Sequence, residues 1–135
     1  MEIKQALVIA VEIGECLLVS GGGVSRVEDT IGRICRAYGA GEVDVFSITS
    51  SIVASVRDEN GEVYTRTKRI RNFHTDFAKL DQLNQLSRYI CQYQPELEEI
   101  EARLKQIREG GQMTLWRQAL ISAAIASAFA VFFGG

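Results

Sequence analysis

The chain has 135 residues, which is enough for one compact domain and a short further segment. Hydrophobic residues make up 47% and charged residues 24%, with one proline, a balance that excludes a disordered or low-complexity chain. The formal net charge of -2 gives no overall electrostatic basis for binding nucleic acid, so we expect no nucleic-acid partner. The charged residues are unevenly spread, because residues 118–135 carry none.

The three cysteines, Cys16, Cys35 and Cys91, stand far apart in the sequence. A disulfide framework or a zinc site needs paired, closely spaced ligands, so neither is indicated. Each cysteine falls on or beside an apolar stripe, which is typical of reduced thiols in a cytosolic core. His74 is the only histidine, which excludes a metal site with two histidines from one chain. We therefore expect no metal and no cofactor.

Two helices are predicted at the start of the chain. Within residues 3–18, apolar residues recur at intervals of three and four, which predicts a helix with one buried face. This predicted face is formed by Ile3, Ala6, Leu7, Ala10, Ile13, Leu17 and Leu18. Residues 20–23, Ser-Gly-Gly-Gly, end this helix, because a glycine can take the left-handed conformation of a C-terminal cap. Ser25 and Glu28 have the spacing of a capping box, so a second helix is predicted from Ser25 to Gly39.

The pattern then changes to three strands. Residues 42–49, 52–57 and 62–70 are rich in Val, Ile, Thr and Phe and partly alternate between apolar and polar. Residues 58–61, Asp-Glu-Asn-Gly, form a short loop with a strong turn signal at Asn-Gly. We expect an antiparallel hairpin at this loop.

Two further helices follow the strands. Thr75 is a candidate N-cap for the first of them, whose predicted apolar face is formed by Phe77, Leu80, Leu83, Leu86 and Ile90. Pro95 breaks this helix and suits the first turn of the next one. The apolar seam of that last helix is formed by Leu97, Ile100, Leu104 and Ile107.

An uncharged, apolar run closes the sequence. It reaches the lower limit of the ~17–20 residues that span a bilayer, so we interpret residues 113–133 as a membrane helix. A buried core helix or a hydrophobic tail is the alternative. The predicted fold is α+β: two helices, a three-stranded antiparallel sheet, two helices, then a transmembrane helix. The predicted domains are 1–112, a cytosolic α+β domain, and 113–135, a membrane region.

The residues that could carry chemistry are few. The glycine turn at residues 21–23, before the helix at Ser25, could hold an anion with its backbone amides, or could be a plain corner between helices. The candidate substrate-binding residues are Ser25, Arg26, Glu28 and Ser50. A catalytic triad would need one of these serines with His74 and Asp76, and the spacing gives no support for it. We therefore predict no catalytic residues and no enzyme activity.

A basic strand edge is predicted along the third strand and just after it, formed by Arg66, Lys68, Arg69 and Arg71. Charged edge strands resist edge-to-edge aggregation, which is the simpler interpretation. The functional interpretation is contact with anionic lipid headgroups, to which each charge contributes roughly 1 kcal/mol.

Residues 20–40 read SGGGVSRVEDTIGRICRAYGA, residues 42–46 read EVDVF, and residues 51–56 read SIVASV. These segments, with Arg69-Ile70 and the later helix containing LNQLSR, resemble the signature of the bacterial threonine/serine exporter family. The resemblance covers essentially the whole chain, and it brings no catalytic motif.

The resemblance implies a cytosolic α+β domain followed by about five membrane helices in the cell membrane. It implies export of threonine and serine, or of dicarboxylates such as succinate in some relatives, with the domain gating or assembling the transporter. The implied partners are the membrane, a remaining or second transmembrane subunit, and further copies in an oligomer. The sequence stops inside the first membrane helix, so we expect that this chain alone transports nothing. The alternatives are a soluble ligand-sensing or interaction module, and a hydrolase.

Overall fold

The computed structural model describes residues 1–110, which form four helices and one sheet. The elements in chain order are α1 (Ile3–Val19), α2 (Val24–Ala37), β1 (Glu42–Ile48), β2 (Ser51–Arg57), β3 (Val63–Arg69), α3 (Phe77–Tyr93) and α4 (Leu97–Arg108). This order confirms the predicted α+β arrangement of two helices, three strands and two helices. The predicted membrane helix at 113–133 lies outside the described residues. Within residues 1–110, no helix is long and apolar enough to cross a membrane.

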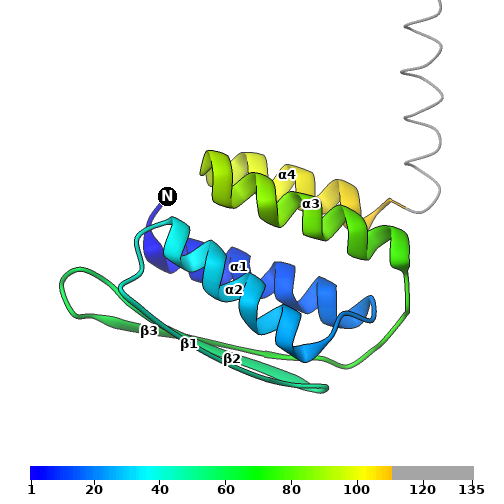
Figure 1. Ribbon diagram of the computed structural model, residues 1–135, viewed down its shortest axis with the longest axis horizontal. Coiled ribbons are helices and arrows are strands. Elements are labelled where there is room, and N and C mark those ends of the chain that lie inside the picture. Colours follow the sequence, from blue (N-terminus) through cyan, green and yellow to red (C-terminus); the bar gives the residue numbers. More distant parts are fainter. Residues whose placement is uncertain (111–135) are drawn as a thin grey trace, which may run out of the picture.

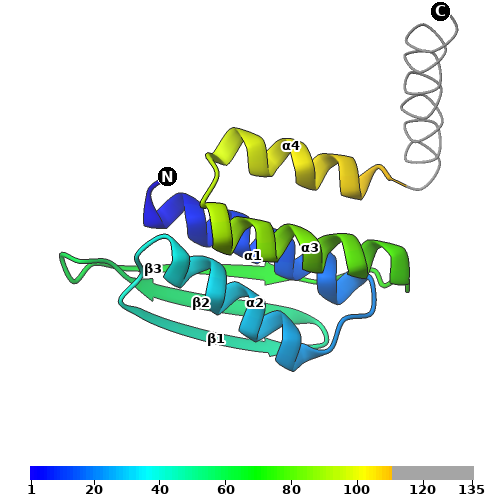
Figure 2. The same ribbon diagram turned by 45° about the horizontal axis from the view of Figure 1, so that its top comes forward.

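The domain is built in layers. The sheet has the order β1-β2-β3 with both pairs antiparallel. Helices α1 and α2 cover one face of it, and α3 and α4 pack on the far side of these two helices (Figures 1 and 2). No element within residues 1–110 covers the other face of the sheet, where Phe46, Ile48 and Val63 are exposed.

Helix α1 is the centre of the core. It contacts α2, α3, α4 and the strands β2 and β3, so it is buried on nearly every side. Its buried residues include Ile9 and Val11, which lie outside the single face that the sequence predicted. That prediction was too narrow, because a helix surrounded by other elements buries apolar residues all round. Each fully buried Leu or Ile contributes roughly 1.5–3 kcal/mol to stability.

The glycine turn after α1 is a C-terminal cap. Gly21 has φ 101, and its amide donates to the Leu18 carbonyl at 3.2 Å. The amide of Gly22 donates to the Leu17 carbonyl at 2.7 Å. This pair of bonds is a Schellman motif, and it confirms the predicted left-handed glycine. Because both amides are used in the cap, they are not available to hold an anion.

The predicted starts of two helices were wrong. The N-cap of α2 is Gly23, so Ser25 lies inside the first turn and makes no capping bond. The N-cap of α3 is Asp76, not Thr75, and its carboxylate accepts from the Lys79 amide at 3.0 Å. Aspartate is as good a cap as threonine, so spacing alone did not separate the neighbours.

Two further predictions about α3 and α4 need correction. Phe77, predicted in the buried face of α3, is the first residue of the helix and is 78% exposed. Pro95 lies before the N-cap of α4, Glu96, and not in its first turn. Most of the remaining predicted positions are buried in the core, namely Leu83, Leu86, Ile90, Ile100 and Leu104. Leu80, Leu97 and Ile107 are only partly buried against it.

The predicted basic strand edge is divided between the two faces of the sheet. Side chains alternate along a strand, so Lys68, paired in register with buried Ile52, faces the helices. Its ammonium lies 3.3 Å from the Oε2 atom of Glu15 on α1. Arg69 pairs in register with Ser51 on the open face. The four basic residues therefore do not form one continuous edge.

The β2–β3 turn follows its predicted chemistry. The carboxylate of Asp58 accepts from the amides of Asn60 and Glu62, each at 2.9 Å. Gly61 has φ 83, which a glycine adopts without strain. The structure thus confirms the antiparallel hairpin.

Candidate functional site

An open groove lined mainly by polar residues lies between α2 and α3, with a volume of about 620 Å³. Sites for small molecules typically have volumes of ~300–1,000 Å³. Helix α2 contributes Gly23, Ser25, Arg26, Asp29, Thr30 and Arg33. Helix α3 contributes Asn84, Ser87 and Arg88. The spacing of three and four places each set on one side of its helix. We call this hollow the α2–α3 groove.

The α2–α3 groove carries excess positive charge, because three arginines and one aspartate line it. Asp29 is already paired, since its Oδ2 atom lies 3.0 Å from Nε of Arg33, one turn later on α2. Within residues 1–110, Arg26 and Arg88 have no ion-pair or hydrogen-bond partner. The groove therefore presents two unpaired guanidinium groups, one from each helix.

Two hydroxyl groups lie at the base of the groove. Thr30 is 6% exposed and Ser87 is 8% exposed, and both line the hollow. Neither hydroxyl makes a hydrogen bond within residues 1–110. Neither hydroxyl oxygen is among the fully buried unpaired atoms of residues 1–110, so each is open to the hollow that its residue lines. These two groups are placed to bond a ligand or water in the groove.

The N-terminal end of α2 lies at the α2–α3 groove, which its N-cap residue Gly23 lines. Its N-cap, Gly23, has no side chain, and no side chain caps the helix. The first amides of a helix have no partner inside the helix, and they carry the positive end of the helix dipole. Anions bind at such ends. The positive charge of the arginines and the positive end of the helix dipole therefore both favour binding of an anion in the groove.

The structure separates the four sequence-predicted candidates. Ser25 and Arg26 both line the α2–α3 groove. Glu28 does not, because its carboxylate accepts from the amide of Ser47 on β1 at 3.3 Å and so ties α2 to an edge strand. Ser50 lies exposed in the β1–β2 turn, where its carbonyl accepts from the Ile70 amide at 2.8 Å. Only the first two thus belong to one site.

Sequence reasoning missed the α3 side of the groove. Asn84, Ser87 and Arg88 have helical spacing, and this was the available signal for a polar stripe. Nothing in the pattern said that this stripe faces α2, because that depends on tertiary packing. Thr30 and Arg33 were also missed, although they continue the stripe of Arg26 along α2.

The hypothetical triad is not assembled. Asp76 uses its carboxylate to cap α3, as described above. Within residues 1–110, no hydrogen bond joins His74 to Asp76, to Ser25 or to Ser50. The geometry of this particular triad is therefore absent from the described residues.

The smaller hollows lie along α1, and several of their polar groups are paired with neighbours. In one of them, Cys16 accepts a hydrogen bond from Nε of Arg108 at 3.2 Å. Burial raises the pKa of this thiol, and Arg108 opposes that shift. A thiol with a raised pKa is a poor nucleophile at neutral pH, so this hollow has the character of a packing seam between α1 and α4.

The family model described as "Putative threonine/serine exporter" matches residues 8–135 of the chain. The match begins inside α1, includes every later element of the described domain, and extends through the uncharged run at 118–135. No curated protein and no solved structure matches the chain.

Proposed function

We propose that residues 1–110 are the cytoplasmic domain of a membrane exporter, because this chain belongs to the threonine/serine exporter family. The family membership confirms the resemblance that residues 20–56 indicated. The cargo proposed is a small polar metabolite, either threonine and serine or a dicarboxylate. The domain gates the transport pathway or assembles it with further membrane-spanning subunits and copies of the chain. The observation that carries the proposal is the extent of the family match, which joins the α+β domain to the uncharged run.

The contacts at the end of the domain where α4 ends support a position of this end next to the membrane. The β3–α3 connection lies against the end of α1, since the His74 amide donates to the Val19 carbonyl at 2.9 Å. The end of α4 lies beside the start of α3, since Lys79 Nζ donates to the Arg108 carbonyl at 3.2 Å. These segments gather where α4 ends (Figure 2). The chain therefore continues toward residues 118–135 from this end.

The same end carries the side chains expected at a lipid surface. Phe73 and Phe77 are 56% and 78% exposed, and Arg71 lies exposed beside them in the sequence. Aromatic residues favour the membrane–water interface, and arginine is attracted to anionic headgroups. This combination supports the proposal that this end rests on the bilayer.

The distribution of basic residues supports the cytoplasmic orientation. Arg103, Lys105, Arg108 and Arg117 all precede the uncharged run. Lys and Arg within ~15–20 residues of a membrane segment bias that flank to the cytoplasm, whereas nearby acidic residues contribute little. The domain would thus remain on the cytoplasmic side of the membrane.

The test is to express the full chain with Asn60→Cys in bacteria, fractionate the cells and apply a membrane-impermeant maleimide. Asn60 is exposed in the β2–β3 turn. This turn lies at the opposite end of the sheet from the β3–α3 connection (Figure 1), so a thiol there reports the side of the domain. We expect the chain in the membrane fraction, and labelling only after lysis. The unmodified chain is the matched control for labelling of the three native cysteines.

Each outcome decides a separate part of the proposal. Recovery of the chain in the soluble fraction would refute the membrane position and favour a soluble sensing module. Labelling of Asn60→Cys in intact cells would refute the cytoplasmic orientation. Both are measured without knowledge of the cargo.

A further inference from the structure

We propose that the α2–α3 groove is a binding site for a small dianion that carries two carboxylates. Binding follows from the groove alone, whereas its meaning as regulation of export rests on the function proposed above. The ligand would occupy a site outside the membrane, so its concentration in the cytoplasm would act on the domain and not on the transport pathway directly.

The arrangement of charges indicates an anion. Arg26 and Arg88 approach the groove from opposite helices, and neither has a partner within residues 1–110. A guanidinium group binds a carboxylate through two parallel hydrogen bonds, which gives both strength and direction. Two such groups, one on each helix, match a ligand with two carboxylates better than a ligand with one.

The remaining groups add a second and independent indication. The hydroxyls of Thr30 and Ser87 belong to residues more than nine-tenths buried, and within residues 1–110 they make no hydrogen bond. They can donate to carboxylate oxygens that the guanidinium groups leave free. The uncapped start of α2 contributes amide donors and the positive end of its dipole.

The state of Asp29 argues against a zwitterion. An amino acid needs an acceptor for its ammonium group, and Asp29 is the only acidic residue that lines the groove. Its carboxylate is held by Arg33 at 3.0 Å. Because Arg33 offsets the negative charge of Asp29, the groove attracts the ammonium group of threonine only weakly, and its remaining positive charge favours a dianion at the same site.

The test uses the full chain, purified in detergent, and isothermal titration calorimetry at constant ionic strength. Succinate, L-threonine and inorganic phosphate are the three probes. We expect saturable binding of one succinate per chain, with affinity about ten-fold or more above that of L-threonine and of phosphate. No saturable binding of succinate would overturn the proposal. Tighter binding of L-threonine would overturn the assignment to a dianion, and tighter binding of phosphate the assignment to carboxylates.

Variants connect the binding to the groove. Arg88→Gln keeps a polar, though shorter, side chain and removes its charge, and we expect it to weaken succinate binding about ten-fold or more. Arg36→Gln is the matched control, since Arg36 lies exposed on α2 outside the groove. Equal losses in the two variants would refute the site. Circular dichroism of each variant verifies the fold, which neither arginine supports through an ion pair within residues 1–110.

The two proposals fail separately. A chain that inserts in the membrane without binding succinate would refute the groove and leave the exporter domain intact. A chain that binds succinate but remains in the soluble fraction would refute the membrane position and leave the groove intact.

Discussion

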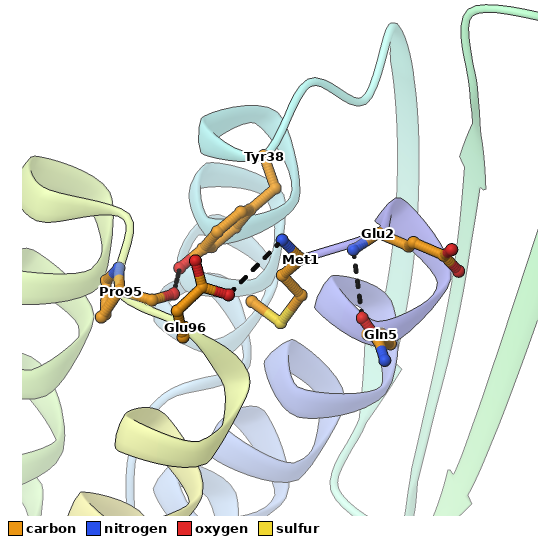
Figure 3. Close-up of polar contacts among 6 residues, drawn as sticks. All are labelled: Met1, Glu2, Gln5, Tyr38, Pro95 and Glu96. Atoms are coloured by element: carbon orange, nitrogen blue, oxygen red, sulfur yellow. Dashed lines mark hydrogen bonds and ion pairs between the residues drawn. The ribbon is translucent and has the colours of Figure 1, made fainter.

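The hydroxyl of Tyr38 donates a hydrogen bond of 2.6 Å to the carbonyl oxygen of Pro95, 57 positions later in the chain (Figure 3). The bond joins the end of α2 to the junction of α3 and α4. Gln94 ends α3 in the left-handed conformation, with φ 47, and the chain reverses there. The N-terminal amine of Met1 lies 4.0 Å from the carboxylate of Glu96 at the same junction.

We predict that Tyr38→Phe lowers the free energy of unfolding by about 0.5–1.5 kcal/mol, because it removes one partly buried hydrogen bond and leaves the ring in place. Urea denaturation followed by circular dichroism measures the change. Tyr93→Phe is the control, since Tyr93 is 63% exposed. Equal effects of the two substitutions would show that the bond to Pro95 does not stabilise the fold.

The same tyrosine should make stability depend on pH in the alkaline range. Burial, with Glu96 nearby, raises the pKa of Tyr38 from 10.0 to about 12. The unfolded chain therefore loses this proton at lower pH than the folded domain. The contribution of Tyr38 is complete below pH ~10 and is lost as pH rises toward about 12. The measurement is unfolding free energy against pH for both the unmodified chain and Tyr38→Phe. Their difference should shrink across this window, and a constant difference would contradict the prediction.

The positions of the elements could be predicted from the sequence, because hydrophobic period and turn residues are local properties. The strands were placed to within a residue at each end. The central place of α1 could not be predicted, since Ile9 and Val11 are buried by elements from distant parts of the sequence. The side of the sheet on which Lys68 lies could have been predicted from the sequence. Side chains alternate along a strand, so Lys68 and its neighbour Arg69 must lie on opposite faces.

The candidate site could be predicted only on its α2 side. Ser25 and Arg26 were recognised because they follow the glycine turn. Glu28 was wrongly given a capping role, because its spacing from Ser25 also fits two residues inside one helix. Arg88 belongs to the groove through packing of α3 on α2. No local pattern specifies that contact.

We predict that Lys68→Met destabilises the domain by about 1–2 kcal/mol, because it leaves a largely buried carboxylate on α1 without its partner. The Oε2 atom of Glu15 is buried, and it has Lys68 as an ion-pair partner but no hydrogen bond within the described part of the chain. A double-mutant cycle with Glu15→Gln measures the coupling by urea denaturation. The double variant should be more stable than Lys68→Met alone. Strictly additive losses would show that the pair is not coupled.

The cysteines should differ in their reactivity. Burial raises the pKa of Cys35 to about 12, and its side chain is 0% exposed. Cys91 is only partly buried. Because the thiolate is the reactive form, we predict that iodoacetamide at pH 8 modifies Cys91 first and Cys35 only when the domain unfolds. Mass spectrometry of the digested protein gives both rates. Equal rates under native conditions would contradict the buried position of Cys35.

The last prediction concerns two glycines inside helices, which should respond to the same substitution with opposite sign. A Cβ atom on Gly14 of α1 would lie 2.6 Å from Cδ1 of Ile31 and 3.3 Å from Cγ1 of Val27, both on α2. Ile31 and Val27 are fully buried and have no room to move. Alanine gains about 1 kcal/mol of helix propensity over glycine, whereas overpacking a core costs about 1–3 kcal/mol. We therefore expect Gly14→Ala to destabilise the domain by about 1 kcal/mol.

Gly32 is the matched position on α2. Its added Cβ would lie 3.1 Å from Nη1 of Arg36, which is the far end of a flexible side chain that can move aside. The gain in helix propensity should then dominate, and Gly32→Ala should stabilise the domain by about 0.5–1 kcal/mol. Urea denaturation of the two variants beside the unmodified chain measures both changes. If Gly14→Ala were as stabilising as Gly32→Ala, then α1 and α2 would not be in the close contact that places α1 at the centre of the core.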